Sequence, residues 1–160
     1  MSTRATSVVV SGTSEVGHKI VVMTSSSELV AVDLTAEQRE FLAKALHQWA
    51  PQWALAASGK PFPLQALGLS TGHELSQLAL RLADAVGHDQ PLTDLDWARA
   101  LYLTECCWAS GLVGLGPDFA AATGLSDADA LSRLRRIQRK IGGAERANLL
   151  FAEHPSHPQP

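Results

Sequence analysis

Helix-capping residues recur along the chain and predict where most of its helices begin. A capping box is a Ser or Thr followed three residues later by Glu or Gln, and its side chains satisfy backbone N–H groups that a helix start leaves unpaired. Thr35 with Gln38 and Thr71 with Glu74 have this spacing. Apolar residues then recur every three or four positions, which is typical of a helix with one buried face. The sequence therefore predicts a mainly helical protein from residue 35 onward.

Further helices follow from N-caps of the same kind. Thr93 and Ser126 each precede a segment with helical apolar periodicity, and Pro117 opens a short helix between them. Pro51 lacks a backbone N–H, so we expect it to kink or restart the first helix. The expected helices span about 36–59, 72–86, 94–112, 117–123 and 127–141.

β-prone residues precede the helices. Three short runs, Thr6–Val10, Lys19–Thr24 and Glu28–Leu34, are separated by turns that contain glycine or serine. This spacing favours a three-stranded antiparallel meander with one face covered by the first helix. We therefore predict an α+β fold, in which a short N-terminal antiparallel β-meander of about three strands is followed by a mainly helical body of four to five helices.

Length and composition indicate a single globular domain. The chain has 160 residues, of which 46% are hydrophobic and 18% charged, which suffices for one hydrophobic core. We place this domain at residues 1–150, β-rich over 1–34 and helical over 35–150, and expect residues 151–160 to be a disordered tail. Glu105 interrupts the longest apolar stretch, so we expect no membrane span. The only two cysteines are adjacent in sequence, which indicates a reduced, cytoplasmic protein.

Charge is distributed unevenly along the chain. Residues 1–130 carry 7 basic and 14 acidic side chains, whereas residues 131–160 carry 6 basic and 2 acidic ones. A basic C-terminal segment on an acidic body predicts contact with an anionic partner, or with an acidic patch of the same protein or of a second copy. The residues expected to make this contact are Arg133, Arg135, Arg136, Arg139 and Lys140.

The segment from Phe119 to Lys140 resembles a helix-turn-helix. Gly124 allows a left-handed turn, Leu125 packs between the two helices, and Ser126 caps the second helix. The resemblance implies that Arg133, Arg136 and Lys140 of the second helix contact DNA phosphates. The two aspartates that open this helix oppose such contact, because a recognition helix meets anionic DNA at that end.

Glu105 projects from the apolar side of its expected helix. At 100° per residue it shares a face with Leu101 and Trp108 and lies opposite Asp96. Burying a carboxylate is costly unless the group is paired, and a buried carboxylate suits a general acid or base. Three interpretations stay open: Glu105 is a catalytic or ligand-binding residue, an arginine from another helix pairs with it, or its site is only half-buried.

The remaining chemistry-bearing residues favour packing over catalysis. Trp49, Trp53, Trp97 and Trp108 are expected in the core, with an aromatic ligand pocket as the alternative. The cysteines lack a CxxC spacing and are expected to be buried, and no histidine pair has a spacing of metal ligands on one helix face. We therefore expect no metal site and no cofactor.

Three functions are consistent with these patterns. The first is a non-catalytic interaction or regulatory protein whose basic C-terminal helix contacts an anionic partner. That partner is another protein or, because strand edges can pair, a second copy in a homodimer. The second is a helix-turn-helix DNA-binding transcription regulator, and the third is a small enzyme or ligand-binding protein that uses Glu105. Because no complete catalytic constellation is present, we favour the first function and a protein that is not an enzyme.

Overall fold

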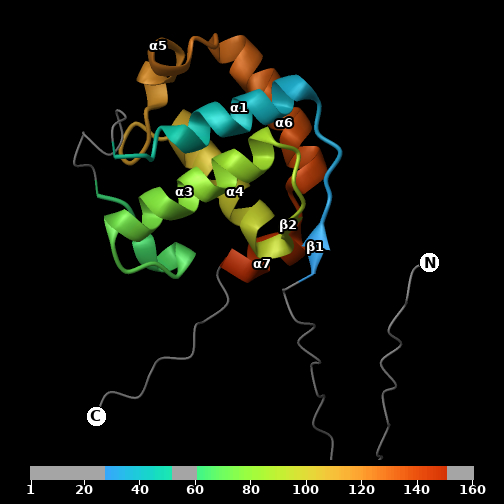
Figure 1. Cartoon of the computed structure of the whole chain (residues 1–160). Coiled ribbons are helices and arrows are strands. Elements are labelled where there is room, and N and C mark those ends of the chain that lie inside the picture. Colours follow the sequence, from blue (N-terminus) through green and yellow to red (C-terminus); the bar gives the residue numbers. More distant parts are fainter. Residues whose placement is uncertain (1–27, 52–60, 151–160) are drawn as a thin grey trace, which may run out of the picture.

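This computed structural model describes residues 28–51 and 61–150 (Figure 1). Within these residues the chain forms six α-helices and a two-stranded sheet. The fold is therefore mainly helical with a small sheet, as the α+β prediction requires at this coarse level. The helices are α1 (Ala36–His47), α3 (Gly72–Gly87), α4 (Asp94–Ala109), α5 (Phe119–Thr123), α6 (Asp127–Ile141) and α7 (Ala144–Leu150). The strands are β1 (Leu29–Val30) and β2 (Leu92–Thr93), and two 3-10 turns, η1 (Leu64–Leu67) and η2 (Gly116–Asp118), complete the set.

Both capping boxes form as the sequence predicts. The Thr35 hydroxyl accepts a hydrogen bond from the Gln38 backbone N–H at 3.3 Å, and the Gln38 side chain accepts one from the Thr35 N–H at 3.0 Å. Thr71 and Glu74 make the same two contacts at the start of α3, at 3.2 and 3.1 Å. The first turns of α1 and α3 are thus capped by residues three positions apart.

The sheet differs from the predicted meander. β1 falls within the third predicted run, but its antiparallel partner is β2, with Leu29 opposite Thr93 and Val30 opposite Leu92. The strand that pairs with β1 therefore comes from the connection between α3 and α4, which no β-propensity signal marked. The first two predicted strands, at 6–10 and 19–24, lie outside the described residues.

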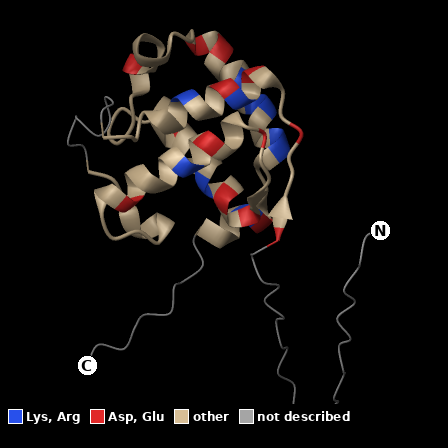
Figure 2. Ribbon diagram, in the orientation of Figure 1, with Lys and Arg blue, Asp and Glu red and all other residues tan. Residues whose placement is uncertain are grey.

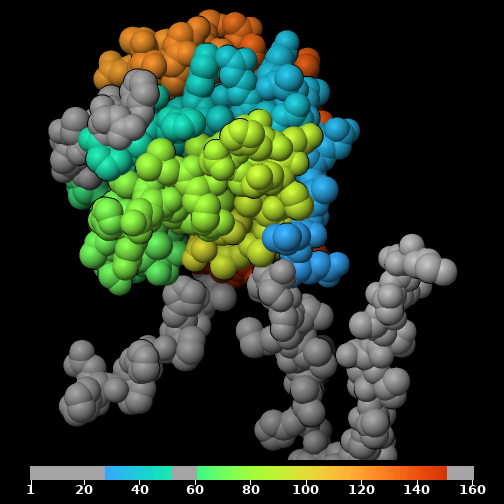
Figure 3. Space-filling view, in the orientation of Figure 1, coloured from blue at the N-terminus to red at the C-terminus, as the bar shows by residue number. Residues whose placement is uncertain are grey.

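α4 occupies the centre of the molecule and contacts α1, α3, α6 and α7 (Figure 1). The segment holding α5 lies against α1 (Figure 3), where the rings of Phe41 and Phe119 are 5.8 Å apart. One continuous core joins these helices. Its largest fully buried side chains include Phe41, Leu42, Leu46, Leu67, Leu82, Val86, Leu103, Phe119, Ile137 and Ile141.

α1 ends at His47, four residues before Pro51, and the part of the first predicted helix at 52–59 lies outside the described residues. α4 ends at Ala109, before its predicted limit, because Ser110 is extended, with φ −93° and ψ 115°. Leu112, the last residue of that predicted helix, lies in the following loop with 83% of its surface exposed. α7 was missed because the glycine pair after α6 indicated only a terminator.

The loop after α4 folds back onto the last turn of that helix. The Leu115 N–H donates to the Cys107 carbonyl at 2.8 Å, and the Gly114 N–H donates to the Ser110 carbonyl at 2.9 Å. A Cβ atom at Gly114 would overlap the backbone carbonyl of Cys106. Glycine is therefore required there by a close approach of two backbone segments.

Gly114→Ala is expected to lower the free energy of unfolding by about 1–3 kcal/mol, because the loop must move to admit the methyl group. Gly111→Ala is the matched control in the same loop, since a Cβ atom there meets nothing within 4 Å. Urea denaturation of both variants checks this expectation. Equal stability of the two variants would contradict it.

Candidate functional site

Local features of the turn between α5 and α6 match those expected from the sequence. Gly124 is left-handed, with φ +72°, and Leu125 is buried. The Ser126 hydroxyl accepts a hydrogen bond from the Asp129 N–H at 3.2 Å and caps α6. α5 itself has only five residues, little more than one turn. The buried face of α6 is the predicted one and consists of Ala130, Leu134, Ile137 and Ile141.

The five basic residues predicted on α6 divide into two sets. Arg135, Arg136 and Arg139 are exposed on the side of α6 that faces away from the core, and we call them the α6 arginine face. Arg133 and Lys140 instead point towards α1. The charge of Arg133 is among the causes that lower the pKa of Glu40, after the hydrogen bond and charge of Lys44.

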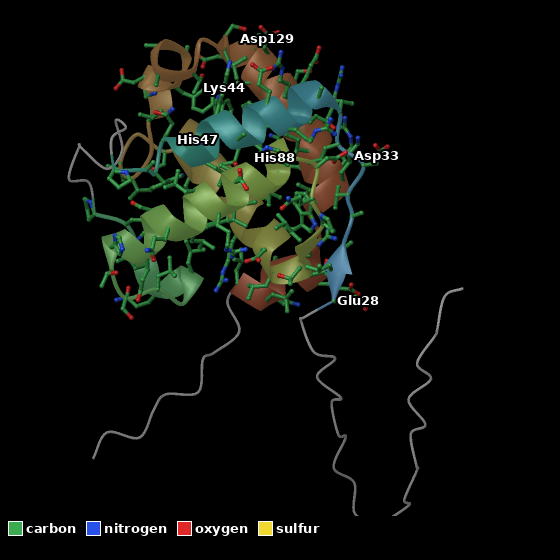
Figure 4. All side chains as sticks on the ribbon, in the orientation of Figure 1. Glu28, Asp33, Lys44, His47, His88 and Asp129 are labelled. Carbon is green, nitrogen blue, oxygen red and sulfur yellow. The ribbon has the colours of Figure 1, made fainter. Side chains whose placement is uncertain are left out.

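Lys140 anchors the entry to α1. Its ammonium donates to the Asp33 carbonyl and to the Gln38 side chain, the latter at 3.1 Å. Asp33, labelled in Figure 4, lies on the segment just before α1. Because the Lys140 ammonium already donates to two acceptors within the fold, it is less available to a partner than expected from the sequence. These two hydrogen bonds hold the end of α6 beside the start of α1.

The α6 arginine face has no carboxylate partner within the described residues. Arg135 donates to the neutral side chain of Gln138 at 3.0 Å, and no ion pair is formed there by Arg135, Arg136 or Arg139. Every described arginine outside α6 is paired. These pairs are Arg39 with Asp89, Arg81 and Arg99 with Asp96, and Arg146 with Asp94.

Acidic residues lie at the opposite end of α6. Asp127 and Asp129 occupy its first turn, where the positive end of the helix dipole favours them. Figure 2 shows this separation as red at the start of α6 and blue further along it, beside the blue of α1. The Asp129 carboxylate also accepts a hydrogen bond from the Ser126 hydroxyl at 2.7 Å, which holds it at the turn. The first turn of α6 therefore repels phosphate groups.

Glu105 is half-buried and has a neutral partner. The Gln138 side-chain amide, from α6, donates to Glu105 Oε1 at 2.6 Å. The arginine partner that sequence reasoning allowed for is absent among the described residues, and an amide takes its place. Glu105 lines a cavity of about 250 Å³ between α4, the end of α6 and α7.

The tryptophans are placed by packing and backbone hydrogen bonds. Trp49 and Trp97 are buried, and their indole N–H groups donate to the carbonyls of Leu103 at 3.3 Å and Val30 at 2.8 Å. Trp108 is half-buried, and Trp53 lies outside the described residues. Of the described tryptophans, none lines the cavity beside Glu105, whose aromatic wall is Tyr102.

Both thiols have raised pKa values. Burial raises the pKa of Cys107 to about 12, and burial is also the largest cause that raises the pKa of the half-buried Cys106. The thiolate is the reactive form of cysteine, so the raised pKa values lower the thiolate fraction of both groups at neutral pH.

Sequence reasoning missed an ion cluster between α3 and α4. Arg81 donates to both carboxylate oxygens of Asp96, at 2.9 and 3.0 Å, and Arg99 approaches the same carboxylate at 3.5 Å. Burial alone would raise the pKa of Asp96, but the hydrogen bond and charge of Arg81 outweigh it and the pKa is lowered. Asp96 and Arg99 are three residues apart on one helix, so their contact could have been inferred from the sequence. Arg81 comes from α3 and reaches Asp96 only through the tertiary fold.

Asp96→Asn is expected to lower the free energy of unfolding at pH 7 by about 1–3 kcal/mol, with solvent screening at the half-exposed Arg81 limiting the loss. Because the folded-state pKa of Asp96 lies below its ordinary 3.8, its stabilisation exists above that value and disappears as the pH falls through the folded-state pKa. Denaturation at pH 7 and pH 3 should thus show a difference from the parent protein that shrinks in acid. Asp84→Asn, at an exposed position, is the control.

No family profile, curated protein or solved structure matches this chain. Within residues 28–51 and 61–150, no group of three or more His, Cys, Asp or Glu side chains is placed to hold a metal ion. No helix of that part of the chain is long and apolar enough to cross a membrane.

Proposed function

We propose that this protein is a non-catalytic interaction protein that binds an acidic segment of another protein through the α6 arginine face. One observation carries the proposal. Arg135, Arg136 and Arg139 share an exposed surface with no carboxylate partner in the described structure, although each described arginine outside α6 has one.

The arrangement of these arginines supports an external partner. Arg135 and Arg139 are four residues apart, and Arg136 and Arg139 are three apart, so their charges lie on neighbouring positions of one helix. Like charges at these spacings destabilise a helix by a few tenths of a kcal/mol, and the negative end of the helix dipole offsets part of this. An acidic partner removes the repulsion, and guanidinium groups bind carboxylates through paired hydrogen bonds.

The partner is argued to be protein rather than DNA because of the first turn of α6. In a helix-turn-helix, the first residues of the second helix approach the bases, and here those residues include Asp127 and Asp129. An acidic peptide that lies along the C-terminal half of α6 meets the arginines and avoids both aspartates. A second copy of this chain, whose N-terminal 130 residues are net acidic, is one protein that offers such a segment.

Charge reversal of Arg135, Arg136 and Arg139 to Glu is expected to weaken binding of an acidic peptide at least tenfold. The measurement is titration of the isotope-labelled chain with a decapeptide of alternating Glu and Ser, followed by backbone amide shifts in 150 mM salt. Shifts should concentrate on residues 132–140. The charge-preserving triple replacement by Lys is the control: it keeps the charge and loses the paired hydrogen bonds, so it should weaken binding less than the Glu variant does.

Two outcomes would overturn the proposal. One is equal binding by the Glu triple variant, and the other is shifts located away from α6. Duplex DNA is titrated in parallel, and binding that is tighter to DNA than to the peptide in 150 mM salt would favour the regulator instead. Sedimentation of the free protein distinguishes self-association from contact with another protein.

A further inference from the structure

The cavity beside Glu105 lies apart from the α6 arginine face and has features of a small-molecule site. It measures about 250 Å³ and is open to solvent on one side. Its walls come from α4, from the end of α6 and from α7, and are mostly apolar. The apolar lining consists of Ala98, Leu101, Ile141, Ala147 and Leu150.

The polar groups of the cavity leave one negative charge without a cationic partner. Glu105 accepts a hydrogen bond from the neutral Gln138 amide and forms no ion pair within the described structure. Arg146 also lines the cavity, but its guanidinium donates to Asp94 at 2.7 Å and to the Ile141 carbonyl at 2.9 Å. The charge of Arg146 is thus balanced by Asp94, and the charge of Glu105 is not balanced.

An aromatic ring lies next to this carboxylate. Tyr102 is three residues before Glu105 on α4, so both side chains reach the same wall of the cavity. The Tyr102 ring packs edge-on against Phe62 at 6.3 Å, and Phe62 packs in the same way against Trp49 at 4.9 Å. This row of rings leads into the core and holds the aromatic wall in place.

We propose that this cavity binds a small organic ammonium ion with an apolar body. The Glu105 carboxylate supplies the opposite charge, the Tyr102 ring supplies a cation–π contact, and the apolar lining takes the rest of the ligand. An anion would be repelled by Glu105, and a neutral ligand would leave that charge desolvated without compensation. An apolar cavity of about 150 Å³ is large enough to bind benzene, so a cavity of about 250 Å³ has room for an aromatic ring that carries a short ammonium arm.

Benzylammonium chloride has this size and charge and is the probe for the first experiment. Benzyl alcohol is its neutral counterpart, and benzoate is its anionic one. Each is titrated into the full-length, isotope-labelled chain at pH 7, followed by backbone amide shifts. Benzylammonium is expected to bind at least tenfold more tightly than benzyl alcohol, with shifts at residues 98–105 and 141–150. Equal affinities for the two, or no binding of benzylammonium, would overturn the proposal.

Variants separate the charge from the shape of the cavity. Glu105→Gln keeps an acceptor for Gln138 and removes the charge, so it should weaken benzylammonium binding at least tenfold and leave benzyl alcohol unaffected. Glu145→Gln, an exposed carboxylate on α7 outside the lining, is the matched control and should bind as the parent does. Ala147→Phe fills the cavity without changing its charge and should weaken both ligands. Unchanged benzylammonium binding by a folded Glu105→Gln or Ala147→Phe protein would also overturn the proposal.

Discussion

Burial of α4 is the constraint on which the rest of the structure depends. This helix contacts α1, α3, α6 and α7, and several of its buried polar groups have partners within the fold. Asp96 is held by Arg81 and Arg99, the Trp97 indole donates to the Val30 carbonyl, and the Thr104 hydroxyl donates to the Ala100 carbonyl. An unpaired buried polar group costs about 1–3 kcal/mol of stability. These contacts therefore allow α4, which carries both polar and apolar buried residues, to lie at the centre of the molecule.

The parts of the fold that the sequence predicted correctly depend on local interactions. Thr35, Thr71, Thr93 and Ser126 all cap helices, because each cap involves residues only three positions apart. The buried stripe of α6 follows equally from helical periodicity. The pairing of β1 with β2 was missed because it joins residues more than 60 positions apart, and two-residue strands carry no periodic signal.

The candidate sites follow the same division. Exposure of Arg135, Arg136 and Arg139 could be inferred from their positions opposite the apolar stripe, and the structure agrees. The involvement of Lys140 with Asp33 and Gln38 could not, because it depends on how α6 crosses α1. The cavity beside Glu105 could not be predicted either, because it depends on tertiary packing. One of its walls is α7, a helix that the sequence pattern did not indicate.

The shortness of α7 has a consequence for how the cavity behaves in time. A seven-residue helix does not persist in water on its own, so α7 is helical only while it is docked on α4. None of its residues is fully buried, and its contacts include those of Arg146 with Asp94 and the Ile141 carbonyl and of the half-buried Leu150. Undocking of α7 and loss of the cavity wall are therefore one local unfolding event, with a free energy below that of global unfolding. A ligand that needs that wall would slow amide hydrogen exchange in α7 while leaving exchange in the central helix set by global unfolding.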